Sequence, residues 1–271
     1  MSRAMVPTVV VSARGEERAH GGHPWIYRGD VIEVRAAAGD IVVVRGTRGR
    51  VIGQAFYSDR SAIALRVLTH GEEPADHALI GRRLEAALAF RASLGIDATA
   101  YRLVHAEADL LPSLIVDRYG DYLVLQALSQ GADRIVPTVL SMLTALLHPI
   151  GVLARNDPRA RLLEGLERRV DVLAGEVPES IIVNDGEIEY DVDIRGGQKT
   201  GLFLDQRENR AAARLYARGR LLDCFSYNGG FALQLADRCR ETIAIDISSE
   251  DRKSTRLNSS HIQKSRMPSS A

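Results

Sequence analysis

The chain has 271 residues, of which 45% are hydrophobic and 26% charged, and its mean hydropathy is −0.09. This apolar fraction excludes a disordered chain, and glycines without a period exclude a collagen. Only two cysteines occur, Cys224 and Cys239, which excludes a disulfide scaffold and indicates a reducing compartment. We expect both to be buried structural thiols. The length allows one large domain or two to three small ones.

The formal net charge of zero conceals three regions of different charge. Residues 1–70 hold ten Arg against six acidic residues, and residues 71–251 hold twenty basic against twenty-nine acidic residues. Residues 252–271 hold five basic and no acidic residues, together with two of the three lysines of the chain. We therefore expect any nucleic-acid contact to be local and N-terminal. The composition of residues 252–271 predicts a foreign or disordered tail, after a natural chain that continued past about residue 250.

No segment predicts targeting or membrane insertion. The apolar run 5–11 is too short for the core of a signal peptide. Residues 135–154 carry no formal charge, but Pro137, His148, Pro149 and Gly151 interrupt them. This pattern favours a buried helix followed by a strand, and we expect a cytoplasmic protein.

The first 71 residues are predicted to form a small β-barrel. Runs rich in Val and Ile at 41–44, 50–56 and 61–68 are separated by turns that contain Gly or Asp. The segment 21–31 contains the only tryptophan, Trp25, which suits a place in the barrel core as well as RNA stacking. We favour Arg28, Arg48 and Arg50 as RNA contacts.

Residues 72–191 mix helical and strand patterns, which predicts a central α+β domain. Apolar spacing over 76–94 predicts a helix that ends at Gly95, and turns at 118–121 and 184–186 predict two hairpins. Glu107 and Asp109 have no histidine nearby, so we expect solvated turn acids rather than the carboxylate pair of a hydrolase. No Cys or His cluster has the spacing of a metal site.

From about residue 192 the pattern becomes that of a parallel α/β sheet. An Ala- and Arg-rich helix at 202–218 precedes a strand at 221–225, a glycine turn at 226–230, a helix at 231–239 and a strand at 242–247. This order opens a doubly wound sheet. If the sheet is interrupted after two strands, its unpaired edges predict low stability from about residue 196 onward.

The glycine turn and the acid after the second strand predict a nucleotide site. Gly229 and Gly230 let a ligand approach main-chain N–H groups, and Asp246 is placed to accept hydrogen bonds from both hydroxyls of a ribose. The G-x-G-x-x-G pattern is absent, so S-adenosylmethionine (SAM) fits better than NAD, which needs a seat for its pyrophosphate. A tight turn with a capping acid is the alternative without function.

A loop at 196–201, Gly-Gly-Gln-Lys-Thr-Gly, is the second candidate site. Lys199 is the only lysine before residue 253, and with Thr200 it can contact a cofactor or an RNA phosphate. A solvated loop lysine explains the residue equally well.

Two of these motifs, GGQKTGLFLDQRENR (196–210) and LLDCFSYNGGFALQLA (221–236), resemble the SAM-dependent rRNA large-subunit methyltransferases of the cytosine-C5 type. The resemblance continues upstream through 177–194, 156–166, 101–126 and 23–31, so it covers nearly all of residues 10–250. It implies a PUA-like RNA-binding barrel at 1–71, a central β-rich domain at 72–191 and the first part of a Rossmann-like methyltransferase domain at 192–251. It also implies methyl transfer to C5 of a cytosine, with 23S rRNA or a precursor of the large ribosomal subunit as partner, and it leaves a homodimer open.

The same resemblance implies a set of cofactor contacts in the loop, the turn and the second strand. They are Lys199, Thr200, Asp223, Phe225, Ser226, Tyr227, Asn228, Gly229, Gly230, Asp246 and Ile247. Attack by cytosine C5 requires a cysteine thiolate that adds at C6. That cysteine and the Pro-Pro motif of the family lie downstream of this point, and the chain has no Pro-Pro pair. We therefore assign no catalytic residue and expect an inactive N-terminal fragment, with a noncatalytic RNA-binding protein as the alternative.

Overall fold

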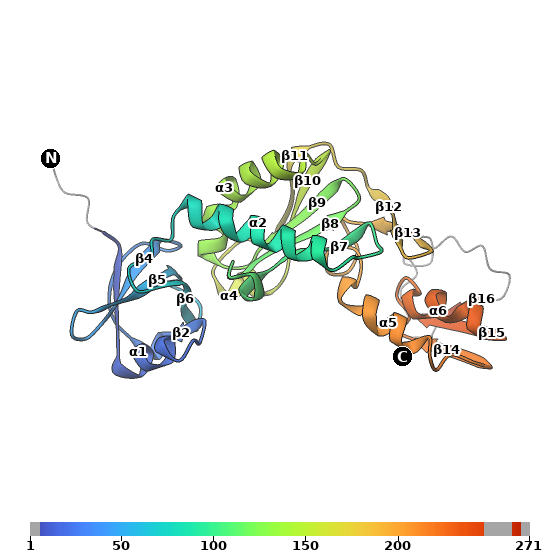
Figure 1. Cartoon of the computed structure of the whole chain (residues 1–271), viewed down its shortest axis with the longest axis horizontal. Helices are drawn as coiled ribbons and strands as arrows, with labels where there is room; N and C mark the ends of the chain where they lie inside the picture. Colours follow the sequence, from blue (N-terminus) through green and yellow to red (C-terminus); the bar gives the residue numbers. More distant parts are fainter. Residues whose placement is uncertain (1–5, 247–261, 267–271) are drawn as a thin grey trace. The chain divides into compact units, whose positions relative to one another are not determined.

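The computed structural model describes residues 6–246 and 262–266, which form two compact units (Figure 1). The first unit comprises Met1–Gly95, Leu103–Asp117 and Asp121–Glu176, and the second comprises Ile96–Arg102, Arg118–Gly120 and Val177–Ala271. No described helix is long and apolar enough to cross a membrane.

The N-terminal part of the first unit is a six-stranded sheet with one helix. Its elements are β1 (Thr8–Val11), α1 (Ala13–His20), β2 (Trp25–Tyr27), the 3-10 turn η1 (Arg28–Asp30), β3 (Val31–Arg35), β4 (Ile41–Gly46), β5 (Val51–Tyr57) and β6 (Ile63–His70). The strands follow the order β2-β6-β5-β4-β1-β3, with β1 parallel to β4 and antiparallel to β3. Alternate residues such as Val9, Val11, Val42 and Val44 are buried in one core. The predicted strands at 41–44, 50–56 and 61–68 are confirmed.

The rest of the first unit is built around a five-stranded sheet, of which the ends of β7 and β8 belong to the second unit. The elements in chain order are α2 (His77–Ser93), β7 (Ala100–His105), the 3-10 turn η2 (Ala106–Asp109), β8 (Leu114–Tyr119), β9 (Tyr122–Ala127), α3 (Gln130–Leu147), β10 (Gly151–Asn156), α4 (Ala160–Leu163) and β11 (Arg169–Gly175). The strand order is β11-β10-β9-β8-β7. Asp76 caps α2 by accepting a hydrogen bond from the N–H of Leu79 at 2.9 Å. The helix expected at 76–94 and the helix followed by a strand expected within 135–154 are both confirmed.

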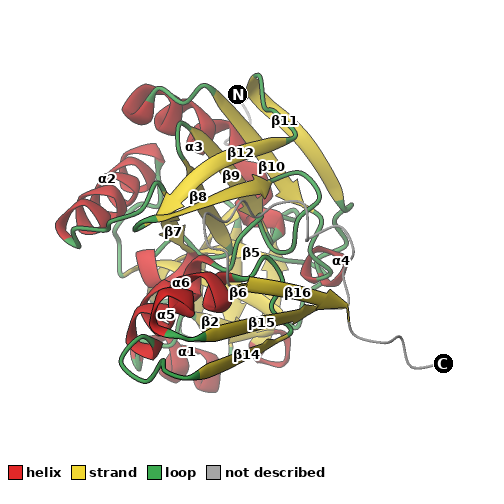
Figure 2. Cartoon of the chain, turned by 90° about the vertical axis from the view of Figure 1, so that its right-hand side faces the viewer, coloured by secondary structure: helices red, strands yellow, loops and turns green. Residues whose placement is uncertain are grey.

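The second unit contains an antiparallel hairpin and a parallel sheet. The hairpin is β12 (Ser180–Asp185) with β13 (Ile188–Asp193). The 3-10 turn η3 (Leu204–Gln206), α5 (Arg207–Ala213), β14 (Arg220–Cys224), α6 (Gly230–Leu235), the 3-10 turn η4 (Ala236–Arg238), β15 (Glu241–Asp246) and β16 (Ile262–Arg266) follow. Figure 2 shows β14, β15 and β16 side by side, in that order and all parallel. The strand–helix–strand unit predicted from the sequence is confirmed.

Three features of the second unit differ from expectation. The helix predicted to reach residue 218 ends at Ala213, because the next three N–H groups bond to carbonyls three residues back and tighten the last turn. The β12–β13 hairpin, assigned from the sequence to the central domain, groups with the second unit. Residues 262–266 form β16, which excludes disorder for them and leaves the alternative of a foreign tail as a prediction; the remainder of 252–271 lies outside the described residues.

Candidate functional site

The turn between β14 and α6 is tight because it uses left-handed backbone conformations. Phe225, Tyr227 and Gly229 have φ values of 62°, 49° and 79°. Left-handed φ is costly for residues with a side chain, and such strain is concentrated at functional sites. The N–H of Gly229 closes the turn by donating to the carbonyl of Ser226 at 2.7 Å.

Two carboxylates hold this turn from the neighbouring strands. Because β14 and β15 are parallel neighbours, both end at the same edge of the sheet. Asp246 Oδ2 accepts a hydrogen bond from the N–H of Tyr227 at 2.7 Å, and Asp223 Oδ2 accepts one from the N–H of Ala232 at 3.0 Å. The turn and the acid that the sequence paired as one site therefore lie side by side.

The electrostatics of this edge favour a cation. Burial raises the pKa of Asp223, and the charge of Asp246 raises it further, while the N–H of Ala232 acts in the opposite direction. The two carboxylates are thus close enough to repel each other. A positively charged group placed between them would relieve that repulsion, whereas an anion would add to it.

The loop at 196–203 packs onto the turn through Tyr227. The hydroxyl of Tyr227 accepts a hydrogen bond from the N–H of Gln198 at 3.0 Å and donates one to the carbonyl of Gly201 at 3.0 Å. Its ring meets the ring of Phe203 edge to face, with 5.4 Å between the centroids. The two motifs singled out in the sequence therefore form one structure. At Gly197 a Cβ would lie 2.3 Å from the carbonyl oxygen of Asp193, so this loop needs glycine there.

The structure gives Lys199 and Thr200 different surroundings. Lys199 Nζ lies 2.8 Å from Asp205 Oδ1 and 4.3 Å from the ring centroid of Phe203, and the side chain remains partly exposed. Thr200 is 1% exposed, and its hydroxyl lies 3.0 Å from the hydroxyl of Tyr119. Thr200 therefore anchors the loop to Tyr119, and its expected contact with the cofactor stays a prediction.

A buried ion pair supports the start of α6. Arg210 Nη2 lies 2.8 Å from Asp185 Oδ2, and the two residues are 6% and 8% exposed. A Cβ at Gly230 would lie 2.8 Å from Arg210 Nη1, so the guanidinium occupies the space that a larger residue would need. Glycine at 230 is therefore explained by packing.

The remaining expected cofactor contacts differ in exposure. Asn228 is buried, Phe225 is 76% exposed, and Ile247 lies outside the described residues. Cys224 is exposed and Cys239 is half-buried, so the expectation of two buried thiols is wrong. Cys224 is the last residue of β14, where its side chain has no covering element among the described residues.

Sequence reasoning missed three residues of this region. Tyr119 anchors the loop through Thr200 and by accepting a hydrogen bond from the N–H of Leu202 at 3.1 Å, but it lies more than eighty positions away and left no signal in the sequence. Phe203 and Asp205 contact Lys199 from only four and six positions away. Their proximity to Lys199, the only lysine before residue 253, was the signal that could have found them.

The three arginines expected to contact RNA lie in the N-terminal sheet. The guanidinium of Arg28 donates to the carbonyls of Ser61 and Ser58 at 3.0 and 2.8 Å, so it holds a turn of the protein, and its expected contact with RNA stays a prediction. Arg48 and Arg50 are exposed in the hairpin between β4 and β5, where the carbonyl of Arg50 accepts a hydrogen bond from the N–H of Gly46 at 3.0 Å.

Two interpretations of this region are corrected. Ile26, not Trp25, fills the barrel core, and the indole N–H of Trp25 donates to Glu107 Oε1 at 2.9 Å. Asp109 pairs with Arg91 at 2.5 Å, with both side chains about nine-tenths buried. Glu107 and Asp109 are therefore bonded within the protein rather than solvated. In the described part of the chain, no three His, Cys, Asp or Glu residues are placed to hold a metal ion.

Comparison with protein families and curated proteins gives matches over most of the chain. Residues 9–70 match the family described as a PUA-like domain. The ribosomal RNA large subunit methyltransferase I of Tolumonas auensis is 40% identical over 253 residues, which cover 90% of this chain and 64% of that protein. The protein of the same name from Klebsiella pneumoniae is 37% identical over 260 residues, which cover 92% and 64%. The chain thus spans about 64% of the length of these relatives.

Solved structures show the same fold at lower identity. A candidate SAM-dependent methyltransferase from Streptococcus mutans aligns with a TM-score of 0.80 and 19% identity, over 97% of this chain and 71% of that one. A second candidate methyltransferase, solved with SAH, aligns with a TM-score of 0.82 and 19% identity, over 98% and 70%. The chain therefore has a mixed α/β fold like that of these two structures, with a PUA-like domain at residues 9–70.

Proposed function

We propose that this protein is a SAM-dependent methyltransferase that acts on ribosomal RNA, at C5 of a cytosine in 23S rRNA. The observation that carries the proposal is the clamp between Asp246 and the N–H of Tyr227, which brings the glycine turn and the acid of the second strand together. The names of the relatives supply the reaction class and the RNA substrate. The proposal assigns no catalytic residue to this chain.

The residues at the turn fit the chemistry of SAM. Asp246 ends β15 beside the turn, where a carboxylate is suited to accept hydrogen bonds from ribose hydroxyls. SAM carries a sulfonium and an ammonium, and the paired negative charge of Asp223 and Asp246 favours both groups. When bound, SAM supplies the methyl group; the residues of this chain bind and orient it.

The same charges argue against the NAD alternative. A pyrophosphate is bound by main-chain N–H groups at the start of a helix, without a carboxylate beside it. Here the N–H of Ala232, in the first turn of α6, already donates to Asp223. A dinucleotide would have to displace that bond and approach two carboxylates.

We propose the PUA-like domain as the part that contacts RNA, with Arg48 and Arg50 as contributors. Both residues are exposed in a hairpin within residues 1–70. This region holds ten Arg against six acidic residues, whereas acidic residues are in excess from 71 to 251. Arginine is suited to this role because its planar fork matches the geometry of a phosphate.

Isothermal titration of the whole chain with SAM tests the proposal. We expect heat of binding with SAM and none with NAD. Asp246→Asn should weaken SAM binding about tenfold or more, which corresponds to about 1.4 kcal/mol. Asp237→Asn is the matched control, because Asp237 is an exposed acid of the same unit paired with Arg214. A folded chain that gives no heat with SAM would favour the noncatalytic RNA-binding alternative.

A further inference from the structure

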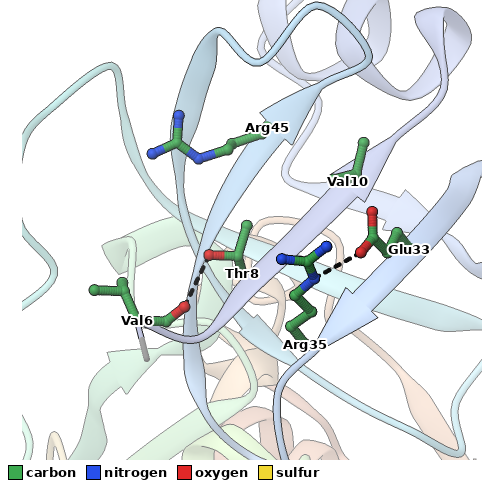
Figure 3. A pocket seen from close by; sticks show the side chains of 6 residues that line it. All are labelled: Val6, Thr8, Val10, Glu33, Arg35 and Arg45. Atoms are coloured by element: carbon green, nitrogen blue, oxygen red, sulfur yellow. Dashed lines mark hydrogen bonds and ion pairs between the residues drawn. The ribbon is translucent and has the colours of Figure 1, made fainter. Parts of the chain in front are cut away.

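A pocket on the outer face of the PUA-like domain belongs to none of the features described above. It has a volume of about 270 Å³ and is lined by Val6, Thr8, Val10, Glu33, Arg35 and Arg45 (Figure 3). Thr8 and Val10 alternate along β1 with the core residues Val9 and Val11, so the pocket lies on the face opposite the core.

The strand register fixes the two charged walls of this pocket. On β3, Arg35 pairs in register with Thr8, and Glu33 pairs with Val10. On β4, Arg45 pairs with Val10 from the other side. One guanidinium therefore stands on each side of β1, over a floor made by a threonine and valines.

Both guanidinium groups keep donors for a ligand. Arg35 Nε lies 2.6 Å from Glu33 Oε1, but both side chains are about half exposed, so the pair contributes little stability. Arg45 Nη1 donates to the carbonyl of Gly49 at 2.8 Å. Each guanidinium has five N–H donors, and these contacts use only one from each.

The positive charge continues beyond the pocket. The turn between β4 and β5 begins after Gly46, the residue that follows Arg45, and carries the exposed Arg48 and Arg50. A line of arginines therefore runs from the pocket to the hairpin. A flexible anionic chain fits such a line better than a compact anion, which would contact only one end of it.

We propose that this pocket holds one nucleotide of a single-stranded RNA segment, with Arg35 and Arg45 on its phosphates and the face of Thr8 and Val10 against its sugar or base. The next phosphates along the strand then reach Arg48 and Arg50. This inference rests on the proposed function in that the RNA-binding domain serves an RNA-modifying protein.

Substitution of Glu33 should change RNA affinity in the direction opposite to substitution of the arginines. In the free protein it holds Arg35, and its charge repels an incoming phosphate. Glu33→Gln should therefore raise RNA affinity, whereas Arg35→Ala and Arg45→Ala should lower it. If RNA instead binds at another surface of the protein, these three substitutions should change its affinity no more than the same charge changes made elsewhere.

Fluorescence anisotropy with a labelled single-stranded RNA, measured at several salt concentrations on the whole chain, is the test. We expect Arg45→Ala to weaken binding about tenfold and to reduce the salt slope by about 0.7 for each phosphate that the variant no longer neutralises. Arg82→Ala is the control, because Arg82 is an equally exposed arginine paired with Glu73 on the first unit. Thermal unfolding of each variant confirms that it folds.

The outcomes separate this proposal from the proposed function. Unchanged RNA affinity in Arg35→Ala and Arg45→Ala, or an equal loss in Arg82→Ala, would overturn the pocket as the RNA site. A duplex RNA that binds more tightly than the single strand would do the same. We expect the pocket variants to bind SAM as the unaltered chain does. If the unaltered chain does not bind SAM, that result counts against the methyltransferase function and leaves the pocket proposal standing.

Discussion

The N–H of Tyr227 lies 2.7 Å from Asp246 Oδ2, and this one bond ties the turn after β14 to the end of β15. On its other side Tyr227 holds the loop at 196–203 through its hydroxyl. Tyr227 is therefore the residue at which the loop, the turn and the second strand meet. A substitution at Asp246 or in the loop at 196–203 should therefore also affect the turn that contains Tyr227.

Two substitutions at Asp246 should separate its structural and ligand-binding roles. Asp246→Asn keeps an acceptor for the N–H of Tyr227, so we expect near-normal stability with weakened SAM binding. Asp246→Ala removes the acceptor and should cost an additional amount of about 1 kcal/mol in the free energy of unfolding. Urea unfolding and titration with SAM measure the two effects. Equal stability of both variants would show that the bond to Tyr227 is unimportant.

Removal of the Tyr227 hydroxyl should make the loop at 196–203 more mobile while the aromatic ring of residue 227 stays packed. Tyr227→Phe keeps the edge-to-face contact with Phe203 but removes the partner of Gln198 and Gly201. We expect a loss of about 1 kcal/mol in unfolding free energy and faster amide exchange over residues 196–203. Tyr216→Phe is the control, since Tyr216 is 78% exposed. Amide exchange at the loop that is no faster than in the control would contradict the assigned role of the hydroxyl.

The Asp185–Arg210 pair should be the most sensitive interaction of the second unit. Arg210→Ala leaves a buried carboxylate without its cation, which typically costs about 3–5 kcal/mol. The exposed pair between Arg220 and Glu241, 2.6 Å apart, provides the comparison, and Arg220→Ala should cost less than about 1 kcal/mol. Denaturant unfolding of the two variants is the measurement. Similar losses in both would mean that burial does not decide the strength of these pairs.

Sequence patterns predicted those elements whose signals are local. The strands at β4, β5 and β6 and the unit from β14 to β15 were found because runs of Val, Ile and Leu alternate with Gly- and Asp-containing turns. Helix α1 was missed, because its sequence ARGEERAH has no large apolar residue and buries only Gly15 and Ala19. The hydroxyl of Ser12, which accepts a hydrogen bond from the N–H of Gly15 at 3.2 Å, caps its N-terminus.

In the candidate site, too, the sequence predicted the features with local signals and missed those that depend on distant contacts. Asp246 and the glycine turn were predicted together because parallel neighbouring strands end at one edge of a sheet. The burial of Thr200 against Tyr119 depends on a contact across more than eighty positions, which no local pattern carries. The role of Arg28 in holding a turn was missed for a similar reason, since its carbonyl partners Ser58 and Ser61 lie about thirty positions away.

The raised pKa of Asp223 predicts a pH dependence of stability with a defined sign. Since burial and the charge of Asp246 raise the pKa in the folded state, the folded protein binds more protons than the unfolded chain between the ordinary carboxyl pKa, about 3.9, and the raised value. Stability conferred by this group is therefore lost as the pH rises through that window. Asp223→Asn keeps an acceptor for the N–H of Ala232 and cannot ionise, so the stability of this variant relative to the unaltered chain should grow as the pH rises over the same range.

Asp237→Asn should show the opposite pH dependence. The hydrogen bond and charge of Arg214 lower the pKa of Asp237, so the unaltered chain gains stability from this group as the pH rises and the variant does not. Urea unfolding of the three proteins from the acid range to neutrality measures both signs, and a parallel pH dependence of the two variants would refute the raised pKa of Asp223.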